Sequence, residues 1–298
     1  MPARTTDHQN DEPWLPRSPG STEENDLARL KGKIALVSGG SSGLGRAIAL
    51  RFGQEGATVI VSDQREQPIW ASGSPPPGDA LPTADAIRAT GGTADFVECD
   101  VTDVDAVDAV LGDAGGITGR VDIVVNAAAM FNRLPIADTT DEDWEQLIGV
   151  NLTGSFYLCR ATIRQFLKQD LVNEVRGRLI NLSSQHGIVA PPGNFSYAVS
   201  KAGVAQMTRQ LALDYATEGI LVNAVAPGFV VTGSHEGGPE YLENGQEAPA
   251  YALGSSRTPY PRLGRPDDIA GAALYLASDD CTFMSGHNML VDGGWTIW

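Results

Sequence analysis

The chain has 298 residues, of which 42% are hydrophobic and 19% are charged, and these proportions are typical of a soluble globular protein with a large core. No apolar run approaches the roughly 18 residues that a membrane-spanning helix needs, and the polar first residues are unlike a secretory signal peptide. The net charge of −16 makes nucleic acid and anionic membranes poor partners, because phosphate groups are repelled. Because the three cysteines lie far apart and His8, His235 and His287 have no partners at ligand spacing, we expect no disulfide framework, no metal site and a cytoplasmic location.

Residues 1–30 are polar and contain prolines without a sustained period, which predicts a flexible N-terminal extension. From residue 31 to residue 298, short apolar runs alternate with longer segments of helical spacing. This alternation predicts a single doubly wound α/β domain, with a parallel sheet and helices on both faces. The predicted strands are 34–37, 58–61, 96–97, 123–125, 179–182, 221–225 and 289–291, and the clearest helices are 44–52, 144–168, 197–215 and 267–276.

The first strand runs into a glycine-rich turn, Ser38-Gly39-Gly40-Ser41-Ser42-Gly43-Leu44-Gly45, which a helix follows at once. Glycines allow a tight turn and a close approach of the backbone to a pyrophosphate, which the N-terminal end of the helix stabilises. Glycines alone are a weak signal, but this turn stands between a predicted strand and a predicted helix, as a phosphate-binding turn requires. The segment therefore predicts a nucleotide site.

The second strand ends at Asp63, 18 residues after Gly45. A carboxylate there accepts hydrogen bonds from a ribose 2′-hydroxyl and repels a 2′-phosphate, which favours NAD over NADP. Arg65 leaves the alternative open, because a guanidinium at that position is able to pair with a 2′-phosphate. Residues 66–82 contain three consecutive prolines and are predicted to form a loop insertion.

Polar residues lie at the end of one strand and on the next helix in the middle of the chain. The strand 179–182 delivers Ser184 at its C-terminal end, where ligands bind in open α/β sheets. Tyr197 and Lys201 are four positions apart and share one face of the following helix. An ammonium within about 4 Å is worth roughly 4 kcal/mol, enough to bring a phenol pKa of about 10 toward neutrality before desolvation opposes it. The spacing predicts a proton-transferring tyrosine.

Residues 233–260 form a second insertion, which follows the strand 221–225 and is long for a connection without periodic structure. Its glycines allow hinge movement, and Tyr241, Leu242 and Tyr251 supply apolar surface. We expect a lid that closes over the substrate and excludes water. A fixed surface loop and a subunit contact are the alternatives.

Taken in order, these motifs resemble the short-chain dehydrogenase/reductase family in its shorter form, over residues 31–298. The glycine-rich turn is similar to the family's Thr-Gly-x-x-x-Gly-x-Gly, with Ser38 in place of Thr. Asn126-Ala127-Ala128-Ala129 stands where the family has Asn-Asn-Ala-Gly, and departs from it at the second and fourth positions. The other matching positions are Asp100, Val101, Asn151, Ser184, Tyr197, Lys201, Pro227, Gly228, Thr232 and the segments 262–270 and 291–294.

The resemblance implies a Rossmann domain and a nicotinamide-dependent oxidoreductase. It implies that Tyr197 is the general acid/base, that Lys201 tunes it and holds the nicotinamide ribose, and that Ser184 orients the reacting oxygen. Asn151 is implied to hold a water that relays protons through Lys201. The cofactor-binding residues that it implies, together with those expected above, are Gly39, Ser41, Ser42, Gly43, Leu44, Asp63, Asp100, Val101, Asn126, Ala127, Ala128, Tyr197, Lys201, Pro227, Gly228, Val230 and Thr232.

The predicted function is that of an NAD-dependent dehydrogenase acting on a secondary alcohol, polyol or sugar, or on the matching ketone. An NADP-dependent carbonyl reductase is the alternative. A non-catalytic nucleotide sensor is a remoter one, which the presence of all four catalytic residues disfavours.

Gln185, His186 and Asn194 are the candidate substrate contacts, and the alternative for His186 is an ordinary loop histidine. Trp295 and Trp298 are expected to pack on a neighbouring subunit. The helices 144–168 and 197–215 carry more apolar positions than one sheet face needs, which predicts a homo-oligomer, a tetramer or a dimer.

Overall fold

The computed structural model describes residues 28–69, 81–232, 242–243, 246–247, 254 and 256–298. Its centre is a seven-stranded sheet in the order β3-β2-β1-β4-β5-β6-β9, and every neighbouring pair is parallel. The chain winds outward from β1 in one direction and from β4 in the other, so the predicted doubly wound fold is confirmed. The strands are β1 Ile34–Ser38, β2 Thr58–Asp63, β3 Thr93–Glu98, β4 Ile123–Asn126, β5 Gly177–Leu182, β6 Ile220–Pro227 and β9 Asn288–Val291, with a separate antiparallel pair, β7 Leu242–Glu243 and β8 Gln246–Glu247.

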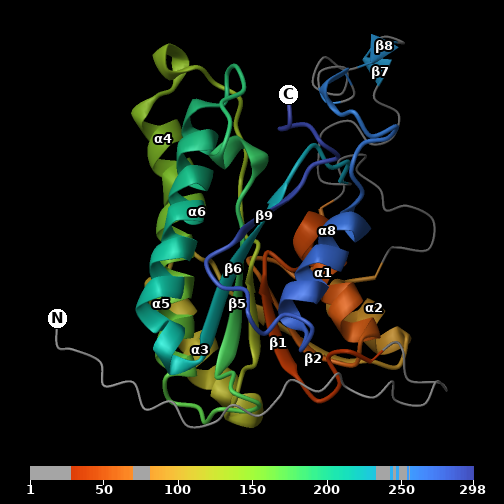
Figure 1. Cartoon of the computed structure of the whole chain (residues 1–298), viewed down its shortest axis with the longest axis vertical. Helices are drawn as coiled ribbons and strands as arrows, with labels where there is room; N and C mark the ends of the chain where they lie inside the picture. The colour runs from red at the N-terminus through yellow and green to blue at the C-terminus, as the bar shows by residue number, and fades with distance from the viewer. Residues whose placement is uncertain (1–27, 70–80, 233–241, 244–245, 248–253, 255) are drawn as a thin grey trace, which may run out of the picture.

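Helices cover both faces of the sheet (Figure 1). Successive side chains along a strand point to opposite faces of the sheet and join two different buried clusters. In β1, Val37 packs toward one helix layer and Leu36 toward the other. This burial on both faces explains the nearly continuous apolar runs in the sequence. One layer holds α1 Gly43–Gln54, α2 Thr83–Ala89 and α8 Pro266–Ala277, and the other holds α3 Val104–Thr118, α4 Asp141–Ile148, α5 Ser155–Phe166 and α6 Phe195–Tyr215.

The segment predicted as one helix over 144–168 is divided in the structure. A π-helical stretch, Gly149–Gly154, separates α4 from α5. The Asn151 side chain accepts a hydrogen bond from the Met130 backbone N–H at 2.8 Å and donates one to the Met130 carbonyl at 2.9 Å. A π-bulge widens a helix by one residue and is common where a side chain must be placed for function. Apolar spacing does not reveal it.

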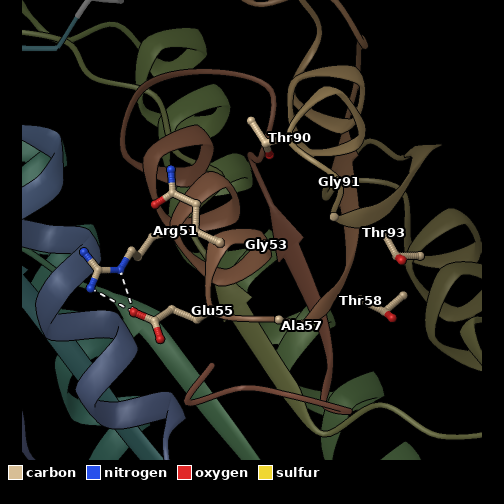
Figure 2. Close-up of a pocket in the computed structure, with 11 residues that line it drawn as sticks. Arg51, Gly53, Glu55, Ala57, Thr58, Thr90, Gly91 and Thr93 are labelled. Atoms are coloured by element: carbon tan, nitrogen blue, oxygen red, sulfur yellow. Dashed lines mark hydrogen bonds and ion pairs between the residues drawn. The ribbon is translucent and has the colours of Figure 1, made fainter. Parts of the chain in front are cut away.

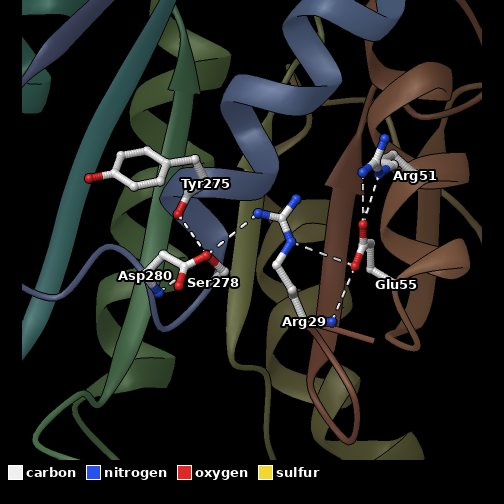
Figure 3. A network of polar contacts seen from close by, with 6 residues as sticks. All are labelled: Arg29, Arg51, Glu55, Tyr275, Ser278 and Asp280. Carbon is white, nitrogen blue, oxygen red and sulfur yellow. Dashed lines mark hydrogen bonds and ion pairs between the residues drawn. The ribbon is translucent and has the colours of Figure 1, made fainter. Parts of the chain in front are cut away.

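The folded domain begins before residue 31, where the sequence placed its start. Leu30 is fully buried, and the Arg29 backbone N–H donates to the carboxylate of Glu55 at 3.1 Å. The same carboxylate accepts two hydrogen bonds from the guanidinium of Arg51, at 2.8 and 3.0 Å, and Arg29 also reaches Asp280 at 3.5 Å (Figure 3). These contacts join the start of the domain to α1 and to the end of α8.

Both insertions fall largely outside the described residues. For the insertion at 66–82, the described ends at 66–69 and 81–82 contain no helix or strand, as expected. For the predicted lid at 233–260, the described parts are the short β7–β8 pair, Gly254 and residues 256–260. Within the described chain, no helix is long and apolar enough to cross a membrane.

Candidate active site

The polar residues predicted to act together lie past the carboxyl ends of the central strands. Ser184 follows β5, Asn126 ends β4 and the glycine-rich turn follows β1. In open α/β sheets this is the edge at which ligands bind. A separate pocket lies at the opposite edge, where Thr58 and Thr93 begin β2 and β3 and where Arg51 is paired with Glu55 (Figure 2). That pocket contains none of the predicted site residues.

The glycine-rich turn is built for close packing and for an anion. Gly39 has a φ of +64°, and a Cβ on it would lie 2.7 Å from the Ala128 backbone. A Cβ on Gly45 would overlap the carbonyl oxygen of Gly39, so only glycine lets α1 start this close to β1. Ser42 precedes α1 without a side-chain cap, and the first turn of α1 holds no acidic residue. Uncapped N–H groups at the positive end of a helix suit a pyrophosphate, so the turn fits a dinucleotide.

Asp63 faces this turn from the end of β2. Its carboxylate accepts hydrogen bonds from the backbone N–H groups of Ser41 at 3.1 Å and Gln64 at 2.8 Å. Burial raises the pKa of Asp63, although these hydrogen bonds and the charge of Arg65 lower it. The charged carboxylate and the competing guanidinium therefore lie together beside the turn, as the sequence suggested.

The segment that departs from the family pattern, Asn126-Ala127-Ala128-Ala129, is held by other side chains. The Ser38 hydroxyl accepts hydrogen bonds from the backbone N–H groups of Ala127 and Ala128, at 3.2 and 3.4 Å. Asn126 donates to Asn181 of β5 at 3.1 Å, and both side chains are buried. In this segment, which departs from the family pattern, the backbone N–H groups of Ala127 and Ala128 thus have a partner in Ser38.

Two contacts tie the 66–82 insertion to the glycine-rich turn, and sequence reasoning found neither. The Ile69 backbone N–H donates to the Ser42 hydroxyl at 2.7 Å. At the other end, the buried Thr83 hydroxyl donates to the Gly40 carbonyl at 2.9 Å and accepts from Arg46 at 2.8 Å. The first described part of the insertion and the residue that follows its end therefore both contact the turn that would hold the phosphates.

Ser184, Tyr197 and Lys201 come together as predicted. The Ser184 side chain lies near enough to the Tyr197 hydroxyl to lower its pKa, and the Lys201 Nζ lies 5.8 Å from the centre of the Tyr197 ring. Lys201 is 3% exposed and donates to the Leu182 carbonyl at 2.8 Å. Burial lowers the pKa of Lys201 to about 8.

In the protein on its own, burial outweighs any lowering of the Tyr197 pKa by the charge of Lys201. Burial raises the pKa of Tyr197, and the hydrogen bond from Ser184 only partly offsets this. The physical reason is that burial removes water that would solvate the phenolate, which disfavours the charged form. The positive charge of Lys201 favours the phenolate, but by a smaller amount. The neutral phenol, a proton donor, is the favoured form.

Asn151 lies beside this group and contacts it through Ser200. Its side-chain amide donates to the Ser200 hydroxyl at 3.2 Å, and that hydroxyl donates to the Tyr197 carbonyl at 2.7 Å. Both ends of the amide also bind Met130 of the loop after β4. Asn151 therefore fixes that loop against α6, and its role in a proton relay stays a prediction.

The candidate substrate contacts surround Tyr197 unequally. The His186 ring lies edge-on to the Tyr197 ring, with centres 6.1 Å apart, and Gln185 is buried next to it. Burial, helped by the charge of Arg133, lowers the pKa of His186 to about 4, so the ring is neutral. Asn194 is a buried residue directly before α6, and its Oδ1 has no hydrogen-bond partner.

Two aromatic residues near Tyr197 and His186, Phe131 and Trp295, were not predicted from the sequence to lie at this site. Phe131, half exposed, packs edge-on against Tyr197 with ring centres 4.9 Å apart. Trp295 is 4% exposed within its own chain, 6.0 Å from the His186 ring and 4.2 Å from the Arg257 guanidinium. The expectation that Trp295 packs on a neighbouring subunit is therefore wrong, because the C-terminal turn folds back onto the site. Trp298 remains 71% exposed.

The remaining predicted cofactor residues lie along the same sheet edge. Burial opposes ionisation of Asp100, but hydrogen bonds from Thr102 at 2.7 and 2.8 Å lower its pKa. Val101 follows Asp100 after β3, Pro227 and Gly228 stand at the end of β6, and Val230 and Thr232 are buried just beyond it.

Among the residues that the structure describes, no group of three or more His, Cys, Asp or Glu is placed to hold a metal ion.

Comparison with known proteins agrees with this geometry. A family model described as enoyl-(acyl carrier protein) reductase matches residues 39–296. The chain is 39% identical to 3β-hydroxysteroid dehydrogenase 1 of Eggerthella lenta over 90% of its own length and 95% of the relative's. A short-chain type dehydrogenase/reductase from Mycobacterium marinum superposes with a TM-score of 0.77 at 32% identity, covering 91% of this chain and 98% of that one. A structure from Beutenbergia cavernae, described as an NAD(P)-dependent gluconate 5-dehydrogenase with NADP bound at low occupancy, gives 0.76 at 30% identity, covering 90% and 98%.

Proposed function

This chain belongs to the short-chain dehydrogenase/reductase family, and from that premise we propose that it is an NAD-dependent dehydrogenase of secondary alcohols, polyols or sugars. Membership makes it an oxidoreductase that acts on alcohol and ketone groups and binds a nicotinamide cofactor. One observation carries the proposal. Ser184, Tyr197 and a buried Lys201 lie together, with the Lys201 Nζ 5.8 Å from the centre of the Tyr197 ring, at the sheet edge where α1 presents an uncapped N-terminus.

In this proposal, Tyr197 moves the proton. Burial keeps its phenol protonated, so it donates a proton to the oxygen of a ketone and takes one back from an alcohol. Ser184 holds the same oxygen with its hydroxyl and stabilises the charge that develops on it. Lys201 lies under the Tyr197 ring, where its charge favours the phenolate form that alcohol oxidation needs.

The residues present fit a dinucleotide along this edge. The turn after β1 and the start of α1 would hold its phosphates, and Asp63 would hold the adenosine ribose. When bound, the cofactor accepts or supplies the hydride. Lys201 would hold the nicotinamide ribose.

The preference for NAD rests on Asp63. Its carboxylate would repel a 2′-phosphate, whereas it would accept hydrogen bonds from a 2′-hydroxyl. Arg65 favours the second candidate, an NADP-dependent carbonyl reductase, because its charge acts on Asp63 and it stands next to the same ribose position. The NADP bound to the Beutenbergia cavernae protein shows that this cofactor occurs among similar folds.

A single assay tests the proposal. A panel of secondary alcohols, polyols and their ketones is incubated with NAD(H) and then with NADP(H), and nicotinamide absorbance is followed. We expect turnover that is faster with NAD(H). Turnover that is faster with NADP(H) supports the reductase instead, and cofactor binding without turnover of any compound supports a sensor.

Two further properties belong to the same proposal. The chain works as a homo-oligomer, a tetramer or a dimer, because α5 and α6 expose apolar side chains on the layer that they share. It acts in the cytoplasm on a small molecule, since its cysteines are free and buried and its net charge is −16.

A further inference from the structure

Two neighbouring side chains beside Tyr197 have hydrogen-bonding capacity that the protein leaves unused. The Gln185 Nε2 and the His186 Nε2 lie 3.3 Å apart, which is the one hydrogen bond between these side chains. The Gln185 Oε1 and the His186 Nδ1 have no partner. Gln185 is only 3% exposed. A buried polar atom without a partner destabilises the protein, so a ligand that satisfies both atoms recovers free energy on binding.

The chemistry of the missing partner follows whichever way the Gln185 amide is oriented. If its NH₂ group donates to His186, the imidazole proton lies on Nδ1, which leaves one donor there and one acceptor on the amide oxygen. If the amide is reversed, the imidazole donates, which leaves an acceptor at Nδ1 and donors on the amide. In both orientations the pair offers a donor on one side chain and an acceptor on the other. A hydroxyl group, which donates and accepts at once, is the complement.

The pair is also in the right place. Gln185 and His186 follow Ser184 directly in a short helical turn, and the Ser184 hydroxyl accepts a hydrogen bond from the His186 backbone N–H at 3.1 Å. The oxygen that reacts at Ser184 and Tyr197 therefore lies close to any oxygen held by the pair. The contact of 3.3 Å is longer than an ordinary hydrogen bond, so little free energy is lost if a ligand replaces it.

Trp295 and the neutral state of the imidazole complete the argument. The Trp295 ring lies against the His186 ring and keeps it beside Tyr197. Burial lowers the pKa of His186 to about 4, so the ring is neutral and keeps both a donor and an acceptor near neutral pH. A charged imidazole would have two donors and would suit an anion instead.

We propose that Gln185 and His186 bind a second hydroxyl of the substrate, on the carbon next to the reacting carbon, so that this enzyme acts on vicinal diols and their α-hydroxy ketones. The inference rests on the proposed dehydrogenase function and narrows its substrate class. The second hydroxyl is not oxidised; it positions the substrate. Trp295 is a positioning residue that acts through His186.

The test compares substrates that differ only in that hydroxyl. Butane-2,3-diol is paired with butan-2-ol, and cyclohexane-1,2-diol with cyclohexanol, with each cofactor. We expect the wild-type kcat/KM for a diol to exceed that for its partner by at least about tenfold, which corresponds to about 1.4 kcal/mol. In His186→Phe, which keeps an aromatic ring against Trp295, this ratio should fall to near one, mainly through a higher KM for the diol. The readout is the ratio of the two kcat/KM values, so a change in activity that is common to both substrates does not affect it.

The control and the contrary outcomes separate the two claims. His287→Phe makes the same replacement at an exposed histidine away from the site and should leave the ratio unchanged. Equal wild-type kcat/KM for diols and simple alcohols, or a His186→Phe variant that lowers both alike, overturns this inference while the dehydrogenase function stands. If cofactor binds and no compound of the wider panel of alcohols, polyols and ketones reacts with either cofactor, both proposals are wrong.

Discussion

The Nζ of Lys201 donates a hydrogen bond to the carbonyl oxygen of Leu182, the last residue of β5, at 2.8 Å. Ser184 follows Leu182 two positions later, so the lysine of α6 is anchored to the strand that leads to Ser184. Because Lys201 is 3% exposed, its ammonium is held where water cannot solvate it. Holding the Lys201 ammonium at this position therefore lowers the free energy of unfolding.

The substitution Lys201→Met is expected to stabilise the protein near neutral pH and to abolish activity. Burial lowers the folded-state pKa from 10.5 to about 8, so below pH 8 the lysine is charged in both states and the wild type carries the whole desolvation cost. Between these two pKa values the unfolded chain binds more protons, so the free energy of unfolding of the wild type rises with pH. We expect the variant to be more stable by up to about 3 kcal/mol at neutral pH.

Urea unfolding of both proteins at neutral pH and near pH 10 measures this difference, with activity as the second readout. The advantage of Lys201→Met should shrink as the pH approaches the unfolded-state pKa. A variant that is less stable than the wild type at both pH values contradicts the account. In that case the hydrogen bond to Leu182 outweighs the desolvation of the ammonium.

The substitution Tyr197→Phe should lower kcat by about 10²–10⁴-fold, because the ring keeps its packing on Phe131 and His186 and loses the group that carries the proton. Nucleotide binding, followed by fluorescence titration, should remain measurable. Tyr215→Phe, at the far end of α6, is the matched control. Retention of a substantial part of the wild-type kcat in Tyr197→Phe would remove Tyr197 from the proton-transfer role.

The fold was predictable because burial on both faces of a parallel sheet marks each strand with apolar residues. Val37, Ile60 and Val124 illustrate this, since each is fully or almost fully buried. The π-helical stretch around Asn151 was not predictable, because it arises from hydrogen bonds to Met130 in a distant loop. Local spacing carries information about which face is apolar and none about a partner so far along the chain.

The site divides in the same way. Glycines at fixed offsets and a Tyr–Lys pair on one helix face are local patterns, so the nucleotide turn and the Ser184–Tyr197–Lys201 group were found from the sequence. Trp295 reaches His186 only because the C-terminal turn folds back across the sheet edge. That contact joins residues more than a hundred positions apart, and no local pattern announces it.

The substitution Thr83→Val is expected to raise the KM for the cofactor several-fold and to leave kcat nearly unchanged. The Thr83 hydroxyl donates a hydrogen bond to the Gly40 carbonyl and accepts one from the Arg46 guanidinium. Loss of such buried hydrogen bonds costs about 1–3 kcal/mol. Thr83→Ser should restore the wild-type KM. Thr90→Val removes a hydroxyl that bonds only within its own turn of chain and should have no effect on cofactor KM. An unchanged KM in Thr83→Val would separate the insertion from the nucleotide site.

The substitution Asp63→Asn is expected to narrow the preference for NAD over NADP by about tenfold or more, which corresponds to about 1.4 kcal/mol. Asparagine keeps an acceptor for the Ser41 backbone N–H and removes the charge, so the change isolates repulsion of the 2′-phosphate. Asp63→Ala loses both and should also raise the KM for NAD. The ratio of kcat/KM for the two cofactors is the measurement. A wild type that prefers NADP contradicts the prediction, and loss of that preference in Arg65→Ala would identify the cause.

The substitution Leu213→Glu is expected to break the proposed oligomer into smaller species without unfolding the subunit. Leu213 on α6 and Phe156 on α5 are 76% and 45% exposed, so in an isolated subunit a charge at Leu213 should change stability by no more than about 0.5 kcal/mol. In an assembly the same charge would be buried without a partner, which opposes association. Sedimentation equilibrium should give a multiple of 31.4 kDa for the wild type and a smaller mass for the variant, with identical far-UV circular dichroism. Leu81→Glu, an exposed leucine before α2, is the control and should sediment as the wild type does. A wild type of 31.4 kDa at micromolar concentration would show that these apolar faces do not bring copies of the chain together.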